Sequence, residues 1–166
     1  QMKILICGLP GSGKSTLAEP FCELINGVWL NADQIRILYD DWDFTPQGRM
    51  RQAQRMRHLA DGVVMAGKIA VADFVCPTSA ARAAFAADYT VFMDTLEASK
   101  STKPAAPGTT FAQTDLIFES VQNSNYHVAT WFNDTHAELV KVVENYMQKQ
   151  DDLNNDRAEG STSGRL

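Results

Sequence analysis

The chain has 166 residues, is 45% hydrophobic, and carries a formal net charge of −5 at pH 7 with a pI of about 5.1. This length and apolar content suit one compact domain with a hydrophobic core. The acidic balance argues against nonspecific binding to long nucleic acid. Three scattered cysteines have neither metal-ligand spacing nor a disulfide framework, which favours reduced thiols. No signal peptide or membrane-spanning run is evident, so we expect a soluble, cytoplasmic protein with no membrane partner.

A phosphate-binding motif opens the chain. Residues 8–15 read Gly-Leu-Pro-Gly-Ser-Gly-Lys-Ser and match G-x-x-x-x-G-K-[ST] at every defined position. The apolar run 3–7 predicts a buried parallel strand before the motif, and 15–25 predicts a helix after it. Glycines permit a tight turn whose N–H groups face an anion, and the helix N-terminus adds a favourable dipole. A chance glycine-rich turn is the alternative, but the flanking elements favour a nucleoside triphosphate site.

Individual residues of this loop have distinct expected roles. Lys14 is expected to reach the β- and γ-phosphates and to contribute to catalysis. The Ser15 hydroxyl is expected to join the coordination shell of Mg²⁺. The predicted cofactor-binding residues are Gly8, Leu9, Pro10, Gly11, Ser12, Gly13, Lys14, Ser15 and Thr16.

Short apolar strands and helices alternate along the rest of the chain. Further strands are predicted at 28–30, 69–74, 89–93 and 126–130, and further helices after 31–33 to about 39, from 46 to about 66, from 77 to about 85 and from 131 to about 148. Thr45 as N-cap and Pro46 at the first helical position begin the helix that Gly67 ends. This alternation predicts an α/β architecture, with a parallel sheet covered on both faces.

We expect a single domain over residues 1–150. Within it, residues 96–110 lack periodicity and are rich in small residues, proline and lysine, which is typical of a functional or mobile lid-like segment. From Asp151 the composition turns polar and rich in glycine and serine. Residues 151–166 are therefore predicted to be a polar C-terminal tail outside the core.

Acidic residues follow several of the predicted strands, at the edge where such sheets bind ligands. Asp33 is expected to face an acceptor hydroxyl and to hold a metal-bound water, and its alternative role is a helix N-cap. Asp73 ends an apolar strand, as an acid that holds Mg²⁺ through water does, and a simple turn residue is an equal alternative. Ser15, Asp33 and Asp73 are thus the metal candidates. Asp94 ends a strand too, and a structural role is favoured for it.

The order and spacing of these blocks resemble adenylylsulphate (APS) kinases. The resemblance covers residues 2 to about 95 and is carried by the phosphate loop, by Asn-Ala-Asp-Gln-Ile-Arg at 31–36, by Phe-Thr-Pro-Gln-Gly-Arg at 44–49, by Ala-Gly-Lys-Ile at 66–69 and by Phe-Val-Cys-Pro at 74–77. Such kinases use Mg·ATP to phosphorylate the 3′-hydroxyl of APS, giving PAPS. The resemblance implies a three-layer P-loop NTPase fold, with a five-stranded parallel sheet of adenylate-kinase type, and ATP and Mg²⁺ as cofactors.

The resemblance also implies roles on the acceptor side of the site. Asp33 matches the second acid of the family's Asp-Gly-Asp block, near the metal and the acceptor hydroxyl. Arg36 and Arg49 match acceptor-binding arginines, whose guanidinium groups suit phosphate or sulphate, although solvated helix charges are the alternative. Phe44 matches an aromatic residue that stacks on the acceptor adenine, or else it forms a hydrophobic staple.

The remaining acceptor positions match the family pattern less well. Gln52 stands where the family has an asparagine that touches the acceptor, and Val75 and Cys76 occupy positions whose backbone lies along the acceptor. Asn31 replaces the first acid of the Asp-Gly-Asp block, and Asp73 replaces a small residue. The family's lid motif has no counterpart in residues 96–110.

The resulting expectation is an ATP-dependent kinase acting on a small nucleotide-like acceptor, with APS as the first choice. One alternative keeps the kinase chemistry but takes a different acceptor: a nucleoside, or the hydroxymethyl group of a modified pyrimidine, either free or as part of DNA. Another is a nucleotide-dependent switch or binding module, although the chain lacks the Asn-Lys-x-Asp signature of guanine-specific switches. We expect no nucleic-acid partner, and the sequence leaves a homodimer open.

Overall fold

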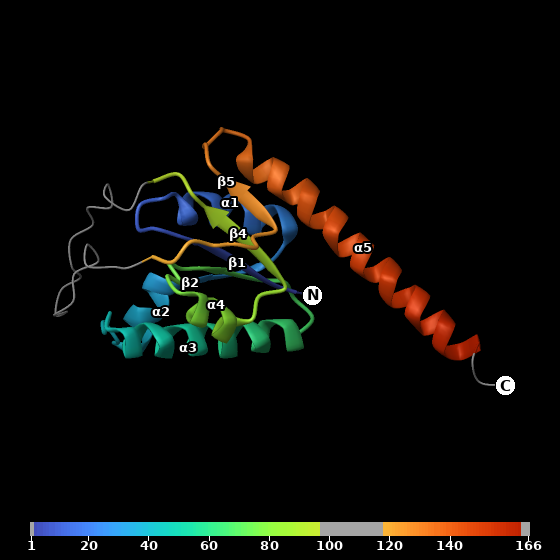
Figure 1. The fold of residues 1–166 in the computed structure, drawn as a ribbon, viewed down its shortest axis with the longest axis horizontal. Coiled ribbons are helices and arrows are strands. Elements are labelled where there is room, and N and C mark those ends of the chain that lie inside the picture. Colours follow the sequence, from blue (N-terminus) through green and yellow to red (C-terminus); the bar gives the residue numbers. More distant parts are fainter. Residues whose placement is uncertain (1, 97–117, 164–166) are drawn as a thin grey trace.

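The computed structural model describes residues 2–96 and 118–163. Five parallel strands form one sheet in the order β2-β3-β1-β4-β5 (Figure 1). The strands are β1 (Lys3–Gly8), β2 (Val28–Asn31), β3 (Ala70–Asp73), β4 (Tyr89–Met93) and β5 (Tyr126–Val128). The helices are α1 (Lys14–Ile25), α2 (Ala32–Tyr39), α3 (Pro46–Met65), α4 (Ser79–Phe85) and α5 (Thr135–Ser163). The predicted five-stranded parallel sheet is confirmed, with β3 and β5 shorter than expected.

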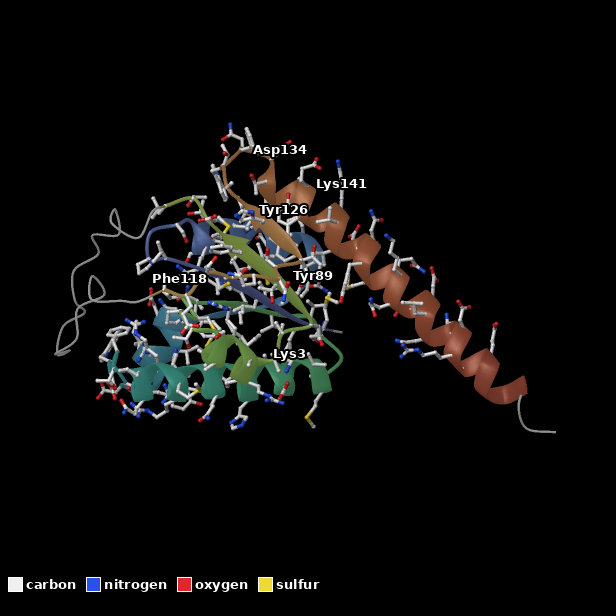
Figure 2. All side chains as sticks on the ribbon, in the orientation of Figure 1. Lys3, Tyr89, Phe118, Tyr126, Asp134 and Lys141 are labelled. Carbon is white, nitrogen blue, oxygen red and sulfur yellow. The ribbon has the colours of Figure 1, made fainter. Side chains whose placement is uncertain are left out.

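Two apolar cores lie on opposite faces of the sheet, which confirms the three-layer arrangement. Along β1, which is buried throughout, Ile4 and Ile6 belong to one core, while Leu5 and Cys7 belong to the other. Helices α1 and α5 cover the first face, and α2, α3 and α4 cover the second (Figures 1 and 2). A strand buried on both faces explains why residues 3–7 read as one continuous apolar run.

Side-chain caps fix where the helices of the second layer begin. The Thr45 hydroxyl accepts a hydrogen bond from the Gly48 N–H at 3.2 Å, as its position before Pro46 predicts. At α2 the cap is Asn31, whose side-chain oxygen accepts from the Gln34 N–H at 3.0 Å. Asp33 is the second residue of α2, so the alternative that Asp33 is the N-cap is wrong.

The last helix is longer than its composition predicts. The sequence places its end near residue 148, whereas α5 continues to Ser163. Residues 150–159 contain neither of the strong helix breakers, proline and glycine, and Gln148 donates to the Asp152 carboxylate one turn later at 3.0 Å. Every residue from 151 to 160 is exposed, and this part of α5 extends away from the sheet (Figure 1). The division of the chain at residue 150 stays a prediction.

The predicted lid-like segment, 96–110, lies outside the described residues except for Leu96. Within residues 2–96 and 118–163, none of the helices combines the length and the hydropathy that a membrane-spanning helix requires.

Two glycines of α3 provide a matched test of packing beneath the site. A Cβ at Gly48 would collide with the backbone carbonyl oxygen of Asp43, whereas a Cβ at Gly62 would meet nothing within 4 Å. We expect Gly48→Ala to lower the free energy of unfolding by about 1–3 kcal/mol, because the turn before α3 must move. Gly62→Ala should raise it by about 0.5–1 kcal/mol, since alanine favours helices. Urea unfolding of both variants measures the difference, and equal effects would contradict the close approach at Gly48.

Candidate active site

The phosphate loop is shaped by glycines that no other residue replaces easily. A Cβ on Gly8 would lie 2.5 Å from the Met93 carbonyl oxygen, so β1 and β4 leave no room there. Gly11 and Gly13 have φ values of +81° and +98°, in the left-handed region that favours glycine. The Thr95 hydroxyl fastens the loop by donating to the Ser12 carbonyl oxygen at 2.7 Å. The loop thus turns tightly and brings the start of α1 to the edge of the sheet.

The donors around this loop fit a polyphosphate. Gly13 provides no side-chain cap for α1, and the first turn contains no acidic residue, so the helix N-terminus can serve an anion. Among the described residues, the buried Ser12 hydroxyl has no hydrogen-bond partner. The Lys14 ammonium donates to the Leu9 carbonyl oxygen at 3.0 Å, which holds its charge at the loop. Backbone amides, a hydroxyl and an ammonium group are therefore gathered where phosphates would bind.

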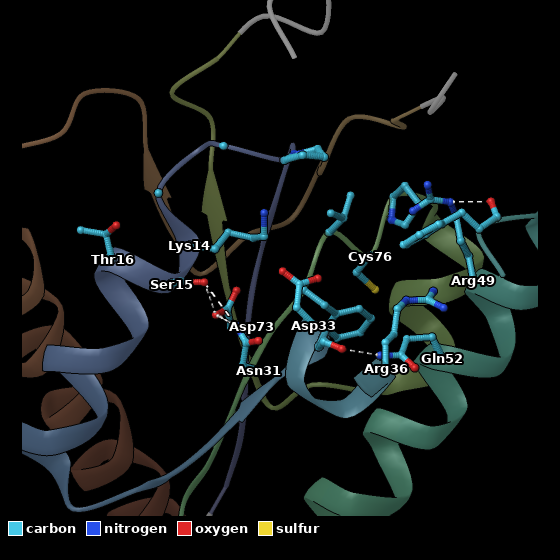
Figure 3. A pocket seen from close by; sticks show the side chains of 18 residues that line it. Lys14, Ser15, Thr16, Asn31, Asp33, Arg36, Arg49, Gln52, Asp73 and Cys76 are labelled. Atoms are coloured by element: carbon cyan, nitrogen blue, oxygen red, sulfur yellow. Dashed lines mark hydrogen bonds between the residues drawn. The ribbon is translucent and has the colours of Figure 1, made fainter. Parts of the chain in front are cut away.

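Asp73 stands at the centre of a polar cluster beside the loop. Its Oδ2 atom accepts hydrogen bonds from Ser15 Oγ and Asn31 Nδ2, both at 2.9 Å, and from Trp29 Nε1 at 3.2 Å. Asn31 and Asp73 are register partners at the ends of β2 and β3, which explains why their side chains meet (Figure 3). A buried carboxylate beside a serine hydroxyl is an oxygen-rich setting of the kind that Mg²⁺ prefers.

Asp33 lies apart from this cluster, on the first turn of α2. It is exposed, and its carboxylate points into the pocket, between Lys14 on one side and Arg36 and Arg49 on the other (Figure 3). Asp73 rather than Asp33 is hydrogen-bonded to Ser15. The two acids therefore occupy different positions, one beside the loop and one facing the acceptor side.

The acceptor side contains two guanidinium groups packed against one ring. Arg36 and Arg49 place their guanidinium carbons 4.3 and 5.0 Å from the centroid of Phe44. Arg36 donates to the carbonyl oxygen of Asp41 at 2.8 Å, and Arg49 donates through Nε to the carbonyl oxygen of Phe44 at 3.0 Å. Phe44 precedes the N-cap of α3, where a hydrophobic staple would begin, but the residue at the fourth helical position is Arg49. The ring therefore stacks against cations.

Burial of these two cations makes the acceptor side receptive to an anion. Burial lowers the pKa of Arg36, against the opposing effect of Asp41. Burial, and then repulsion by Arg36, lowers the pKa of Arg49 to about 10. Both groups stay protonated at neutral pH, so two like charges share a poorly hydrated site. A phosphate or sulphate group between them would offset that cost.

One pocket of about 270 Å³ brings most of the predicted residues together. It is lined by Pro10, Gly11, Gly13, Lys14, Ser15, Thr16, Asp33, Arg36, Phe44, Arg49, Gln52, Asp73, Val75 and Cys76, all of them predicted. Three predicted loop residues, Gly8, Leu9 and Ser12, lie outside the lining and are buried beneath it.

Two predicted acceptor residues are constrained by contacts within the protein. The Gln52 amide donates to the Ala32 carbonyl oxygen at 3.1 Å and accepts from Arg55 at 2.7 Å. Cys76 is buried with φ of +45°, and burial raises the pKa of its thiol well above the usual value. Cys76 therefore forms part of the pocket wall as a neutral thiol. Acceptor contacts of Gln52 and Cys76 stay predictions.

Two residues of the polar cluster were not predicted as site residues. The sequence presents Asn31 only as a departure from the family pattern, and Trp29 as a core or interface residue. The signal for Asn31 is its position, since a polar residue ends β2 directly beside the strand that ends in Asp73. Nothing in the sequence places the Trp29 indole nitrogen on the Asp73 carboxylate.

Comparisons with known proteins give a consistent family. The family model described as adenylylsulphate kinase matches residues 1–101. Among solved structures, an APS kinase from Mycobacterium tuberculosis in complex with AMPPNP and APS is 18% identical with a TM-score of 0.69, over 86% of this chain and 97% of that chain. A hexameric APS kinase from Thiobacillus denitrificans is 16% identical with a TM-score of 0.64, over 87% of this chain and 29% of that chain.

A gluconokinase from Sinorhizobium meliloti shares the fold at 15% identity, with a TM-score of 0.55 over 93% of this chain and 97% of that chain. A comparison of the sequence with curated proteins found no match. The family match identifies the chain as an ATP-dependent phosphotransferase that acts on a hydroxyl group, and the solved structures share its fold. The match spans more than half of the sequence, and with the phosphate loop and the sheet order it shows that the chain belongs to the adenylylsulphate kinase family.

Proposed function

We propose that this kinase transfers the γ-phosphate of ATP to the 3′-hydroxyl of APS, giving PAPS. The observation that carries the proposal is the arrangement of one pocket, with the phosphate loop at one end and the Arg36–Phe44–Arg49 stack at the other. An acceptor with an anionic phosphosulphate matches the two guanidinium groups of that stack. Support also comes from the family match over residues 1–101.

On the donor side, this chain binds and orients the triphosphate. Loop amides and the start of α1 would hold the phosphates, and Lys14 would move from the Leu9 carbonyl oxygen to the β- and γ-phosphate oxygens. Mg²⁺, when bound, neutralises charge on the β- and γ-phosphates. Ser15 and Asp73 would hold it, the serine through its hydroxyl and the acid through water. Asn31 and Trp29 would keep the Asp73 carboxylate in place.

On the acceptor side, Asp33 would orient the hydroxyl and take its proton late in the transfer. Its position on the first turn of α2, between the loop and the two arginines, suits that role. Arg36 and Arg49 would bind the phosphosulphate, and their burial would strengthen the charge-assisted hydrogen bonds. Phe44 is only 5% exposed, so its part in base stacking is limited to whatever face the guanidinium groups leave open.

Phosphoryl transfer from labelled ATP to a panel of acceptors tests the proposal. The panel contains APS, adenosine, a hydroxymethyl-pyrimidine nucleoside and DNA carrying the same modified base. We expect APS to be labelled, and Arg49→Met to raise the KM for APS by about 10-fold or more while changing the KM for ATP little, because a guanidinium–anion contact is lost. Labelling of a nucleoside or modified DNA in place of APS would overturn the assignment of the acceptor.

A further inference from the structure

Asp41 does not line the pocket, yet it contacts Arg36 of α2, which does, and Arg51 and Arg55 of α3. Its side chain is 12% exposed and accepts hydrogen bonds from Arg51 at 2.8 and 3.1 Å and from Arg55 at 2.9 Å. Its main chain exchanges two hydrogen bonds with Arg36: the Asp41 N–H donates to the Arg36 carbonyl oxygen at 3.1 Å, and the Arg36 guanidinium donates to the Asp41 carbonyl oxygen at 2.8 Å. The carboxylate lies 3.8 Å from the same guanidinium.

A second path runs from Asp41 back to the start of α2. Arg55 joins the Asp41 carboxylate to the Gln52 side chain at 2.9 and 2.7 Å, and the Gln52 amide donates to the Ala32 carbonyl oxygen at 3.1 Å. Ala32 is the first residue of α2 and immediately precedes Asp33. The Asp41 carboxylate is thus connected to both ends of α2. Asp33 lies in the first turn of this helix and Arg36 in its last turn.

We propose that Asp41 is a positioning residue that fixes α2 on α3, so that Arg36 and Asp33 are aligned for the acceptor. The inference rests on the proposed function, because it assigns these two residues to the acceptor. Arg55 also packs over the Tyr39 ring, 4.3 Å from its centroid, at the C-terminal end of α2. The hydrogen bonds from Arg51, followed by those from Arg55, hold the pKa of the Asp41 carboxyl well below its usual range. This clamp, formed by the Asp41 carboxylate with Arg51 and Arg55, therefore stays charged at neutral pH.

Positioning and simple charge make opposite predictions for Asp41→Asn. Removal of a negative charge beside Arg36 makes the pocket more positive, which by itself would tighten the binding of an anionic acceptor. Loss of alignment would weaken it. We expect the KM for the acceptor to rise by about 10-fold and kcat to fall by about 10-fold, since small misplacements of reacting groups cost rate. The KM for ATP should change less than about 2-fold, because the hydrogen bonds of the Asp41 carboxylate go to Arg51 and Arg55 of α3 and not to the phosphate loop.

Two further variants distinguish the effect of the contacts through Arg55 and Gln52 from the effect of the charge on Asp41. Arg55→Met cuts the connection to Gln52 and should reproduce the acceptor effect of Asp41→Asn. Arg51→Met removes an exposed partner of the same carboxylate and should leave the acceptor KM within about 2-fold. Asp61→Asn is the matched control, since Asp61 lies on α3 and pairs with Arg57 and Lys3 away from the pocket.

Steady-state kinetics with the acceptor that the wild-type enzyme labels, and thermal unfolding of every variant, complete the test. An unchanged or lowered acceptor KM in folded Asp41→Asn would overturn the inference and leave the acceptor assignment intact. If Asp41→Asn does not fold, Arg55→Met decides in its place. Wild-type enzyme that labels another acceptor would contradict the proposed function, while the clamp would still be tested with that acceptor.

Discussion

Lys14→Ala is expected to lower kcat by about 10³-fold or more, because phosphoryl transfer depends on neutralising charge on the β- and γ-phosphates. The ammonium group lines the pocket and is held at the loop by the Leu9 carbonyl oxygen at 3.0 Å, close to where the phosphates would bind. Alanine at this position keeps the α1 backbone and its N-terminal amides. The loss should therefore be much larger in turnover than in folding stability.

Lys68→Ala provides the control, since Lys68 is an exposed lysine in the turn between α3 and β3. Single-turnover measurements with labelled ATP give the rate of transfer, and calorimetry with Mg·ATP gives the affinity. We expect Lys68→Ala to match the wild-type enzyme in both. A folded Lys14→Ala enzyme with near-normal turnover would show that the loop is not the donor site.

The fold could be predicted because its determinants are local. The apolar run of β1 is buried throughout and that of β4 at alternate residues, and the Thr45-Pro46 pair begins α3 as the cap chemistry requires. The end of α5 was missed because a polar composition was interpreted as a tail. An exposed helix without an apolar face has no periodic signal in the sequence, although α5 continues to Ser163.

The site could be predicted where chemistry follows directly from chain position. The phosphate loop, Asp73 at the end of β3, and Asp33 at the start of the helix that follows β2 belong to this class. Contacts that depend on strand register or on long-range packing could not be predicted from the sequence. The pairing of Asn31 with Asp73 requires the alignment of β2 on β3, and the chain of contacts through Asp41 spans two helices and the turn between them. Side-chain networks of this kind leave no fixed spacing in the sequence.

Asp33→Asn is the second variant with a large expected effect. The amide is nearly isosteric with the carboxylate but cannot accept the proton of the acceptor hydroxyl, so we expect kcat to fall by about 10²-fold or more. The affinity for Mg·ATP should change by less than about 3-fold, because the acid hydrogen-bonded to Ser15 is Asp73. A large fall in kcat without a comparable loss of Mg·ATP affinity would separate the roles of the two acids, with Asp33 acting on the acceptor and Asp73 on the metal.

Asp40→Asn is the matched control at the other end of α2. Asp40 is exposed and caps the helix with φ of +48°, a conformation that asparagine adopts readily. Its replacement makes the same chemical change on the same helix, without a group that faces the pocket. Both variants should unfold at temperatures close to that of the wild-type enzyme. If Asp33→Asn kept near-full turnover with its acceptor, the proton would have to leave without this carboxylate; if it lost Mg·ATP affinity in proportion to turnover, Asp33 would belong to the metal site with Asp73.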